Sequence, residues 1–149
     1  MRLILITILC LFSFFPGNGK TIQVTSGTKI PTIKSALILA QNGDSILVSK
    51  GVYKEQNIII NKSVFLIGIG RPVLDGEDKN EIITVKADFV IIDGFDFMHA
   101  GKSSYMDLAA LKIIDAKDVL IQNNFFENSF FGIYCQQTTR TIIYKNKLY

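Results

Sequence analysis

The chain has very little cysteine, with two residues in 149, Cys10 and Cys135. Cys10 lies inside an apolar stretch that we interpret below as a secretory signal, so Cys135 is the only cysteine of the exported part. A single thiol cannot form an intramolecular disulfide. The exported fold must therefore be held together by packing and hydrogen bonds.

A strong excess of charge is also missing. The formal net charge is +3 at pH 7, and removing Arg2 with the signal leaves +2. So mild an excess, spread over scattered lysines, gives no support for nucleic-acid binding. We expect no nucleic-acid partner.

No apolar run is long enough for a comfortable membrane span, which takes about 20 residues. Arg2 is followed by LILITILCLFSFF and then by PGNG. A short positive segment, an apolar run and then small, turn-forming residues before the cleavage site are typical of a secretory signal peptide. We predict a signal over residues 1–19, cleavage before Lys20, and a periplasmic location for one domain over 20–149. An uncleaved anchor is the alternative.

Helical periodicity is confined to one segment, PTIKSALILAQNGD. Thr32 can cap the first turn, and Asn42-Gly43 provides a stop. We therefore predict one helix near Thr32 to Gln41. Four apolar residues share one face of this helix: Ile33, Ala36, Leu37 and Ala40.

Short apolar runs, rich in Ile, Val and Phe and separated by Gly, Asn or Asp, fill the rest of the chain. Several are apolar throughout, which suits strands buried in a parallel arrangement better than alternating hairpin strands. The predicted strands are 21–24, 46–48, 57–61, 64–67, 81–85, 89–92, 95–98, 111–114, 119–122 and 141–144.

Three segments repeat: FVIIDGFDF (89–97), VLIQNNFFE (119–127) and TIIYKNKLY (141–149). They superpose without gaps, with steps of 30 and 22 residues, so that Gly94, Asn124 and Asn146 fall at one position. VFLIGIGRP (64–72) fits less well, 25 residues before Phe89. A strand repeat in the low twenties predicts a solenoid in which each repeat is one coil of a β-helix.

The 30-residue step implies a standard coil with about eight extra residues. We place them within His99 to Leu108. Core strands cannot take an insertion without losing register, so the extra residues must bulge outward at a corner.

Long stretches of the chain resemble a known family. They are TIKSALILAQNGDSILVSKGVYKEQNIIINKSVFLIGIGRPVLDG, ITVKADFVIIDGFDFMHAG and LKIIDAKDVLIQNNFFENSFFGIYCQQT. Their order resembles the exported, copper-linked maturation proteins of nitrous oxide reductase, the NosD family, within the pectin-lyase-like right-handed parallel β-helices. The resemblance runs from about Ile22 to the end. GDSILVSKGVYKE marks the superfamily, whereas DGFDFMHAGKSSYMDLAALKI followed by NNFFENSFFGIY is nearer to the maturation proteins.

This resemblance implies an all-β fold, a right-handed parallel β-helix whose N-terminal end is capped by the short helix. It implies a non-enzymatic accessory that works with the subunits of a copper-associated ABC transporter to build the copper site of nitrous oxide reductase. Family members are usually longer and carry a C-terminal cap, so we expect 20–149 to be truncated at its C-terminus. A nonfunctional fragment is a further alternative.

Met98, His99 and Met106 are the candidate metal ligands. Thioethers and imidazole suit Cu(I), and these three residues lie close enough in sequence to converge from one loop. The alternatives are that Met98 fills a gap in the core, His99 is solvated at a corner and Met106 covers the next coil. Cys135 is a further soft ligand, but a lone cysteine in a strand is more often a small core residue, and we expect it in the core.

Carboxylates raise the alternative of a carbohydrate-active or carbohydrate-binding β-helix, such as a polysaccharide lyase, hydrolase or epimerase. A glycosidase needs two carboxylates flanking a sugar. Here Asp-Gly pairs and short turns favour structural roles, and no histidine or arginine near in sequence completes a catalytic set. We therefore predict no catalytic residues. The carboxylates considered are Asp75, Asp93, Asp96, Asp107, Asp115 and Asp118.

Asparagines and aromatic residues of the last repeats have structural explanations. Asparagine tolerates left-handed turns, and stacked amides can form a ladder from coil to coil. The aromatic residues are expected to be mostly stacked core, with one or two facing outward. The sets are Asn123, Asn124, Asn128 and Asn146, and Phe125, Phe126, Phe130, Phe131 and Tyr134.

Overall fold

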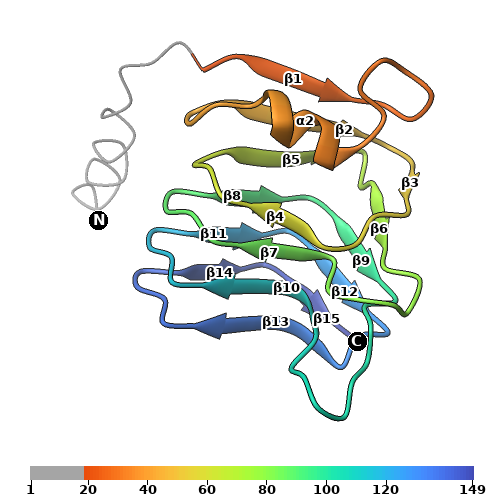
Figure 1. The fold of residues 1–149 in the computed structure, drawn as a ribbon, viewed down its shortest axis with the longest axis vertical. Coiled ribbons are helices and arrows are strands. Elements are labelled where there is room, and N and C mark those ends of the chain that lie inside the picture. The colour runs from red at the N-terminus through yellow and green to blue at the C-terminus, as the bar shows by residue number, and fades with distance from the viewer. Residues whose placement is uncertain (1–18) are drawn as a thin grey trace, which may run out of the picture.

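The structure, a computed structural model, describes residues 19–149 (Figure 1). Except for Gly19, the predicted signal peptide lies outside the described residues. Within 19–149 one helix, α2 (Ile33–Leu39), accompanies strands arranged in three parallel sheets. The chain winds repeatedly through the three sheets, so the prediction of a right-handed parallel β-helix is confirmed.

Each sheet collects one strand from successive coils. Sheet A contains β1 (Thr21–Val24), β2 (Ser45–Ser49), β5 (Phe65–Ile69), β8 (Ile91–Asp93), β11 (Leu120–Gln122) and β14 (Ile142–Tyr144). Sheet B contains β3 (Val52–Tyr53), β6 (Val73–Asp75), β9 (Asp96–Met98), β12 (Phe125–Glu127) and β15 (Lys147–Leu148). Sheet C contains β4 (Ile58–Ile60), β7 (Ile83–Val85), β10 (Ala109–Ile114) and β13 (Phe131–Gln136).

The core is built from residues that occupy the same inward position on successive coils. In sheet B, Leu74, Phe97 and Phe126 stand in register and are buried. The rings of Phe97 and Phe126 stack with their centroids 4.8 Å apart. Because each coil covers the apolar residues of its neighbour, the buried ladders continue along the stack.

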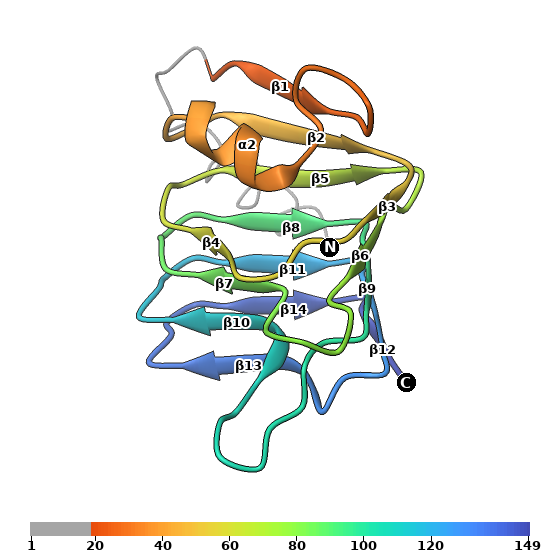
Figure 2. The same ribbon diagram turned by 45° about the vertical axis from the view of Figure 1, so that its right-hand side comes forward.

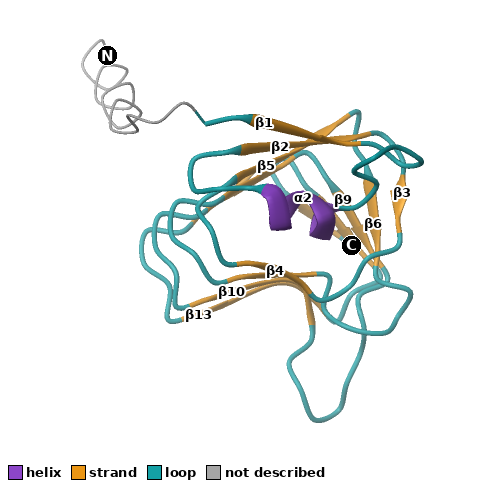
Figure 3. Cartoon of the chain, turned by 45° about the horizontal axis from the view of Figure 1, so that its top comes forward, coloured by secondary structure: helices purple, strands orange, loops and turns teal. Residues whose placement is uncertain are grey.

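The helix covers the N-terminal end of this core (Figure 3), as predicted. Thr32 is the N-cap and forms a capping box with Ser35. The carboxylate of Glu55 accepts hydrogen bonds from the amides of Ile33, at 2.8 Å, and Lys34, at 3.1 Å. This places a negative charge at the positive end of the helix.

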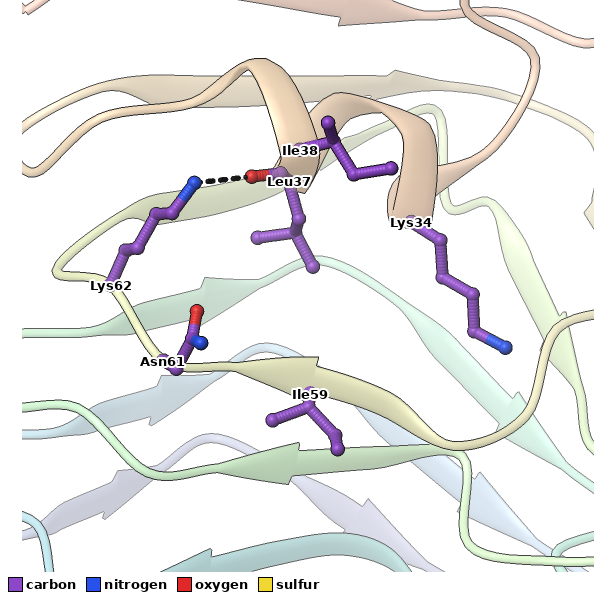
Figure 4. Close-up of a pocket in the computed structure, with 6 residues that line it drawn as sticks. All are labelled: Lys34, Leu37, Ile38, Ile59, Asn61 and Lys62. Atoms are coloured by element: carbon purple, nitrogen blue, oxygen red, sulfur yellow. Dashed lines mark hydrogen bonds between the residues drawn. The ribbon is translucent and has the colours of Figure 1, made fainter.

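The other end of α2 is held by Lys62, whose ammonium donates hydrogen bonds to the carbonyls of Leu37 (2.8 Å) and Ala40 (2.7 Å). These carbonyls have no partners within the helix, so a cation satisfies them well. Figure 4 shows Lys62 reaching back to the helix beside a hollow of about 340 Å³. The helix ends at Leu39, earlier than the predicted Gln41.

The predicted alignment of the repeats was wrong by one residue at its first step. Leu120 pairs with Ile91, a step of 29, whereas the following step of 22 residues is as predicted. Gly94 therefore aligns with Asn123 and Lys145, and all three have positive φ, of 83°, 54° and 52°. Left-handed geometry at this corner accepts glycine, asparagine or lysine, so residue identity there did not fix the register.

The corrected register aligns Asn124 with Phe95, at an inward position. Asn124 is 0 % exposed, and its Oδ1 accepts a hydrogen bond from the amide of Phe95 at 2.9 Å. Asn146 repeats this arrangement one coil later, since its Oδ1 accepts from the amide of Asn124 at 3.0 Å. The predicted asparagine ladder is thus confirmed for these two residues.

The predicted insertion is confirmed in place and is slightly shorter than expected. Residues 99–108 connect β9 to β10, whereas residues 128–130 make the equivalent connection from β12 to β13, a difference of seven. Figure 2 shows the longer connection projecting from the stack. Residues 99–108 are called the projecting loop below.

The buried carboxylate of Asp44 follows the helix and accepts hydrogen bonds from the amides of Lys20 and Gln41. Its contribution to stability depends on pH. Hydrogen bonding to the amide of Gln41 is the main cause that lowers its pKa below 3.8, with Lys20 adding to the effect against the opposing influence of burial. A carboxyl whose pKa is lower in the folded state stabilises the fold above pH 3.8, and this contribution is lost as the pH falls through the lowered value.

We therefore expect Asp44→Asn to lower the free energy of unfolding at pH 7. The difference in free energy of unfolding between this variant and the native chain should narrow below about pH 4. Urea unfolding at several pH values measures this gap. The exposed Glu127 serves as the matched carboxylate, and Glu127→Gln should change the free energy of unfolding at pH 7 by no more than about 0.5 kcal/mol. A gap for Asp44→Asn that is constant from pH 7 to pH 3 would contradict the assignment.

Candidate functional site

The projecting loop leaves sheet B at His99, which follows the last residue of β9. His99 has a positive φ of 53°, and its carbonyl accepts a hydrogen bond from the amide of Asp78 at 2.8 Å. Its imidazole Nδ1 lies 3.0 Å from Oδ1 of Asp75, on the preceding coil. The backbone and the side chain of His99 are thus both fixed to the coil before it.

Asp75 is itself held in place, because its Oδ1 also accepts a hydrogen bond from the amide of Glu77 at 2.9 Å. Burial alone would raise the pKa of Asp75, but the Glu77 amide and the His99 side chain outweigh it and keep this pKa below 3.8. Asp75 is therefore a carboxylate at neutral pH.

An ionised carboxylate only accepts hydrogen bonds, so the proton of a neutral His99 ring is assigned to Nδ1. This leaves the lone pair of Nε2 unused by the pair. The side chain of His99 is 38 % exposed. The imidazole is thus oriented by one nitrogen and available to a ligand through the other.

The two methionines lie in different surroundings. Met98 is half-buried on β9, in register with Asp75 on one side and Glu127 on the other. Met106 is 63 % exposed in the projecting loop, where its amide donates a hydrogen bond to Oγ of Ser103 at 3.1 Å. Met98 and His99 are consecutive residues next to the coil that carries Asp75, whereas Met106 lies on the exposed loop.

Across residues 19–149, no group of three or more His, Cys, Asp or Glu side chains is arranged to hold a metal ion. Two donors that suit a soft metal are adjacent in sequence, the thioether of Met98 and the imidazole of His99. That all three predicted residues bind a metal together stays a prediction.

Cys135 is exposed, so the prediction that it is a core residue was wrong. It pairs in register with Ile113, which is fully buried. Cys135 therefore occupies a position that is covered on earlier coils, but β13 is the outermost strand of sheet C in the described structure. Partial burial raises the pKa of its thiol.

This placement predicts that Cys135 in the native protein reacts with the thiol reagent DTNB, with a rate that rises with pH because the thiolate is the reactive form. The rate should be slower than that of a free cysteine at the same pH, since the pKa is raised. Absorbance at the wavelength of the released thiolate follows the reaction. Labelling that requires unfolding in urea would show Cys135 to be buried.

Histidine and arginine contact three of the carboxylates considered above, although the arginines are distant from them in sequence. Arg71 Nε donates to Asp96 Oδ1 at 3.0 Å. Arg140 makes two hydrogen bonds of 2.6 Å to the carboxylate of Asp118. Partners in these pairs are 22 to 25 residues apart in sequence, about one coil, so parallel stacking places them side by side.

Each of these basic residues is hydrogen-bonded to a different carboxylate. The predicted structural role agrees with a local bond at Asp75-Gly76, where Asp75 Oδ1 accepts from the amide of Glu77 at 2.9 Å. Asp93 instead accepts hydrogen bonds from the side chains of Gln122 (2.8 Å) and Asn123 (2.9 Å) on the next coil.

No family model matches the chain, and neither a curated protein nor a solved structure matches it. Within residues 19–149, no helix has the length and apolar character needed to cross a membrane.

Proposed function

We propose that this chain is a periplasmic, non-enzymatic accessory in the assembly of the copper site of nitrous oxide reductase, working with the subunits of a copper-associated ABC transporter. The sequence resemblance described above motivates this role. The coarse fold agrees with what the resemblance implies. In this role copper is cargo that the chain receives and passes on.

The hydrogen bond between His99 and Asp75 is the observation that carries the proposal. A histidine that binds a metal usually donates its other ring N–H to a carboxylate or carbonyl, which fixes the tautomer and orients the ring. The Nδ1 to Oδ1 distance of 3.0 Å meets this requirement, and Nε2 is left for the cargo.

Met98 supplies the soft ligand next to this imidazole. Thioethers favour Cu(I) over harder divalent ions, which prefer oxygen ligands. Met106, exposed on the projecting loop, is the third donor we assign to the ion, and it would have to approach the other two. A donor set completed by a loop suits the transfer of a metal ion more than its permanent retention.

A competition titration with a coloured Cu(I) chelator tests the proposal. The parent is the Cys135→Ser protein, because the exposed thiol is itself a soft ligand. We expect this parent to bind one Cu(I), and the Met98→Leu, His99→Ala, Met106→Leu variant to lose at least tenfold in affinity.

Asp75→Asn is the positioning control, and it should weaken binding by about 10-fold through the loss of the oriented imidazole. Lys86→Ala, at an exposed lysine away from the site, should change nothing. A triple variant that binds Cu(I) as tightly as the parent would exclude this site and remove the support for the proposed function.

A further inference from the structure

The outer face of sheet A is largely apolar. Side chains in this sheet alternate between the core and the outside, and Leu66, Ile92 and Ile121 are among those that point inward and are fully buried. Figure 3 shows no part of residues 19–149 on the outer side of this sheet. Two outward rows run along the stack: Phe65, Ile91, Leu120 and Ile142 in one, and Leu47, Ile67, Asp93, Gln122 and Tyr144 in the other.

The first of these rows is apolar throughout. Its four residues stand on neighbouring strands about 4.8 Å apart, so the row is about 14 Å long. Leu47 and Ile67 widen it on the side of β2 and β5. On the last strand, Ile142 is 59 % exposed and Tyr144 is 54 % exposed. Proteins rarely leave a contiguous apolar surface uncovered unless it binds a partner or a membrane.

Asp93 is the one charged residue in either row. Its carboxylate accepts hydrogen bonds from the side chains of Gln122 and Asn123, on the next coil. A carboxylate bonded in this way is partly shielded and costs less to bring against an apolar surface. The outer face of sheet A therefore has no unpartnered charge at its centre.

Lysines flank this face at both ends of its strands. Lys86 and Lys117 are exposed in the connections that lead into β8 and β11. At the other end, Lys50 follows β2 and Lys145 follows β14, and both are exposed. The ammonium of Lys145 lies 5.1 Å from the centroid of the Tyr144 ring. Within residues 19–149, none of these four lysines forms an ion pair with a carboxylate.

The positive excess of the described chain lies on this side of the molecule. Sheet A and its connections contain eight lysine or arginine residues and five aspartates. The rest of residues 19–149 contains seven basic and eight acidic residues. The segments counted with sheet A are 19–24, 42–51, 61–72, 86–95, 115–124 and 137–146.

We propose that the outer face of sheet A lies against a membrane surface that contains anionic lipids. The apolar rows contact the boundary between headgroups and acyl chains, and the flanking lysines contact the headgroup phosphates. Lysine can bury its methylene stem while its ammonium stays among polar groups, and basic residues near an anionic lipid surface strengthen binding. The backbone groups of sheet A are paired between strands, so contact with lipid leaves none of them unsatisfied.

A second copy of the chain fits this face less well than a lipid surface does. Two such faces packed together would place the lysine-flanked strand ends of both copies at one interface, and like charges across an interface oppose association. A nucleic acid would contact the lysines but leave the apolar rows without a partner. The proposal does not depend on the proposed function in copper delivery.

Tryptophan fluorescence of the full chain tests the proposal, since the chain has no tryptophan of its own. Tyr144→Trp places the probe on the outer face of sheet A, and Tyr105→Trp places it on the projecting loop, where Tyr105 is 97 % exposed. The vesicles contain phosphatidylcholine with brominated acyl chains, which quench a tryptophan that reaches them, and phosphatidylglycerol as the anionic lipid. We expect strong quenching of the Tyr144→Trp protein and little of the Tyr105→Trp protein.

Comparing the two probes also separates contact through this face from attachment through the apolar run near the N-terminus, which would not favour one probe. Vesicles without phosphatidylglycerol should quench the Tyr144→Trp protein more weakly at every lipid concentration. In this protein, adding Lys86→Gln and Lys117→Gln should raise the lipid concentration for half-maximal quenching about tenfold. Lys34→Gln and Lys102→Gln remove the same charge from the helix and the projecting loop, and should leave it unchanged. Circular dichroism checks that both lysine variants are folded.

Absence of quenching in the Tyr144→Trp protein, or equal quenching of the two probes, would overturn the proposal. Equally strong quenching by neutral vesicles would overturn it too. If sedimentation shows a dimer and acrylamide cannot reach the Tyr144→Trp probe without lipid, a second copy covers the face and the proposal is wrong. Adding Tyr144→Trp to the Cys135→Ser protein should leave Cu(I) binding unchanged, which separates this result from that of the His99 site.

Discussion

Replacing Phe97 by alanine is expected to lower the free energy of unfolding by about 3–5 kcal/mol, the usual cost of truncating a buried phenylalanine. Phe97 is fully buried and stacks on Phe126. Removing the ring leaves a cavity. The neighbouring coils are tightly packed, so their residues can fill only part of this cavity. Urea unfolding followed by circular dichroism measures the change.

Phe130→Ala is the matched control, since Phe130 is 66 % exposed and its main aromatic contact is an edge-on pair with Phe131. Its loss should cost less than about 1.5 kcal/mol. If both variants lose the same stability, Phe97 does not belong to a packed ladder and the described core is wrong.

Asn124→Leu should be the second most damaging change, at about 2–4 kcal/mol. Leucine has nearly the same size, but it would leave the amide of Phe95 without the acceptor that Asn124 Oδ1 provides. It would also leave the carbonyl of Ile92 without the donor that Asn124 Nδ2 provides at 3.1 Å. Each buried polar group left without a partner costs about 1–3 kcal/mol.

Asn61→Leu provides the comparison for this change, because Asn61 is exposed and away from the ladder. An exposed substitution of this kind normally stays within about 0.5 kcal/mol. Equal effects of the two variants in urea unfolding would contradict a stabilising role for the ladder.

The coils could be predicted from sequence because a β-helix repeats its apolar pattern. Each coil must bury Ile, Val, Leu or Phe at the same inward positions, so runs such as 89–92 and 119–122 mark the strands. Strands that lie outside the predicted runs gave no such signal. β3 (Val52–Tyr53) has only two residues, and β13 (Phe131–Gln136) mixes apolar residues with glycine, cysteine and glutamine.

The register was harder to predict than the fold, since corner residues are interchangeable. Gly94, Asn123 and Lys145 all adopt left-handed geometry at one corner. An apparent match between Gly94 and Asn124 was therefore misleading. Asn124 can act in the ladder because it is fully buried. Its burial depends on the residues that the next coil places around it.

Partners from neighbouring coils were missed for a related reason. Asp75 and His99 are 24 residues apart, and Arg71 and Asp96 are 25 apart, so both pairs look distant in a linear reading. The coil period itself was the signal that could have found them. Searching for opposite charges one period apart would have predicted both pairs. Cys135 was misplaced because its exposure depends on the absence of a covering strand among the described residues.

X-ray absorption at the copper edge tests the central claim most directly, because it reports the atoms bound to the ion. In the Cu(I)-loaded Cys135→Ser protein, the account predicts sulfur neighbours from methionine and a nitrogen neighbour from His99. The nitrogen signal should disappear in His99→Ala. Copper surrounded by oxygen and nitrogen alone, or a spectrum that His99→Ala leaves unchanged, would contradict the account.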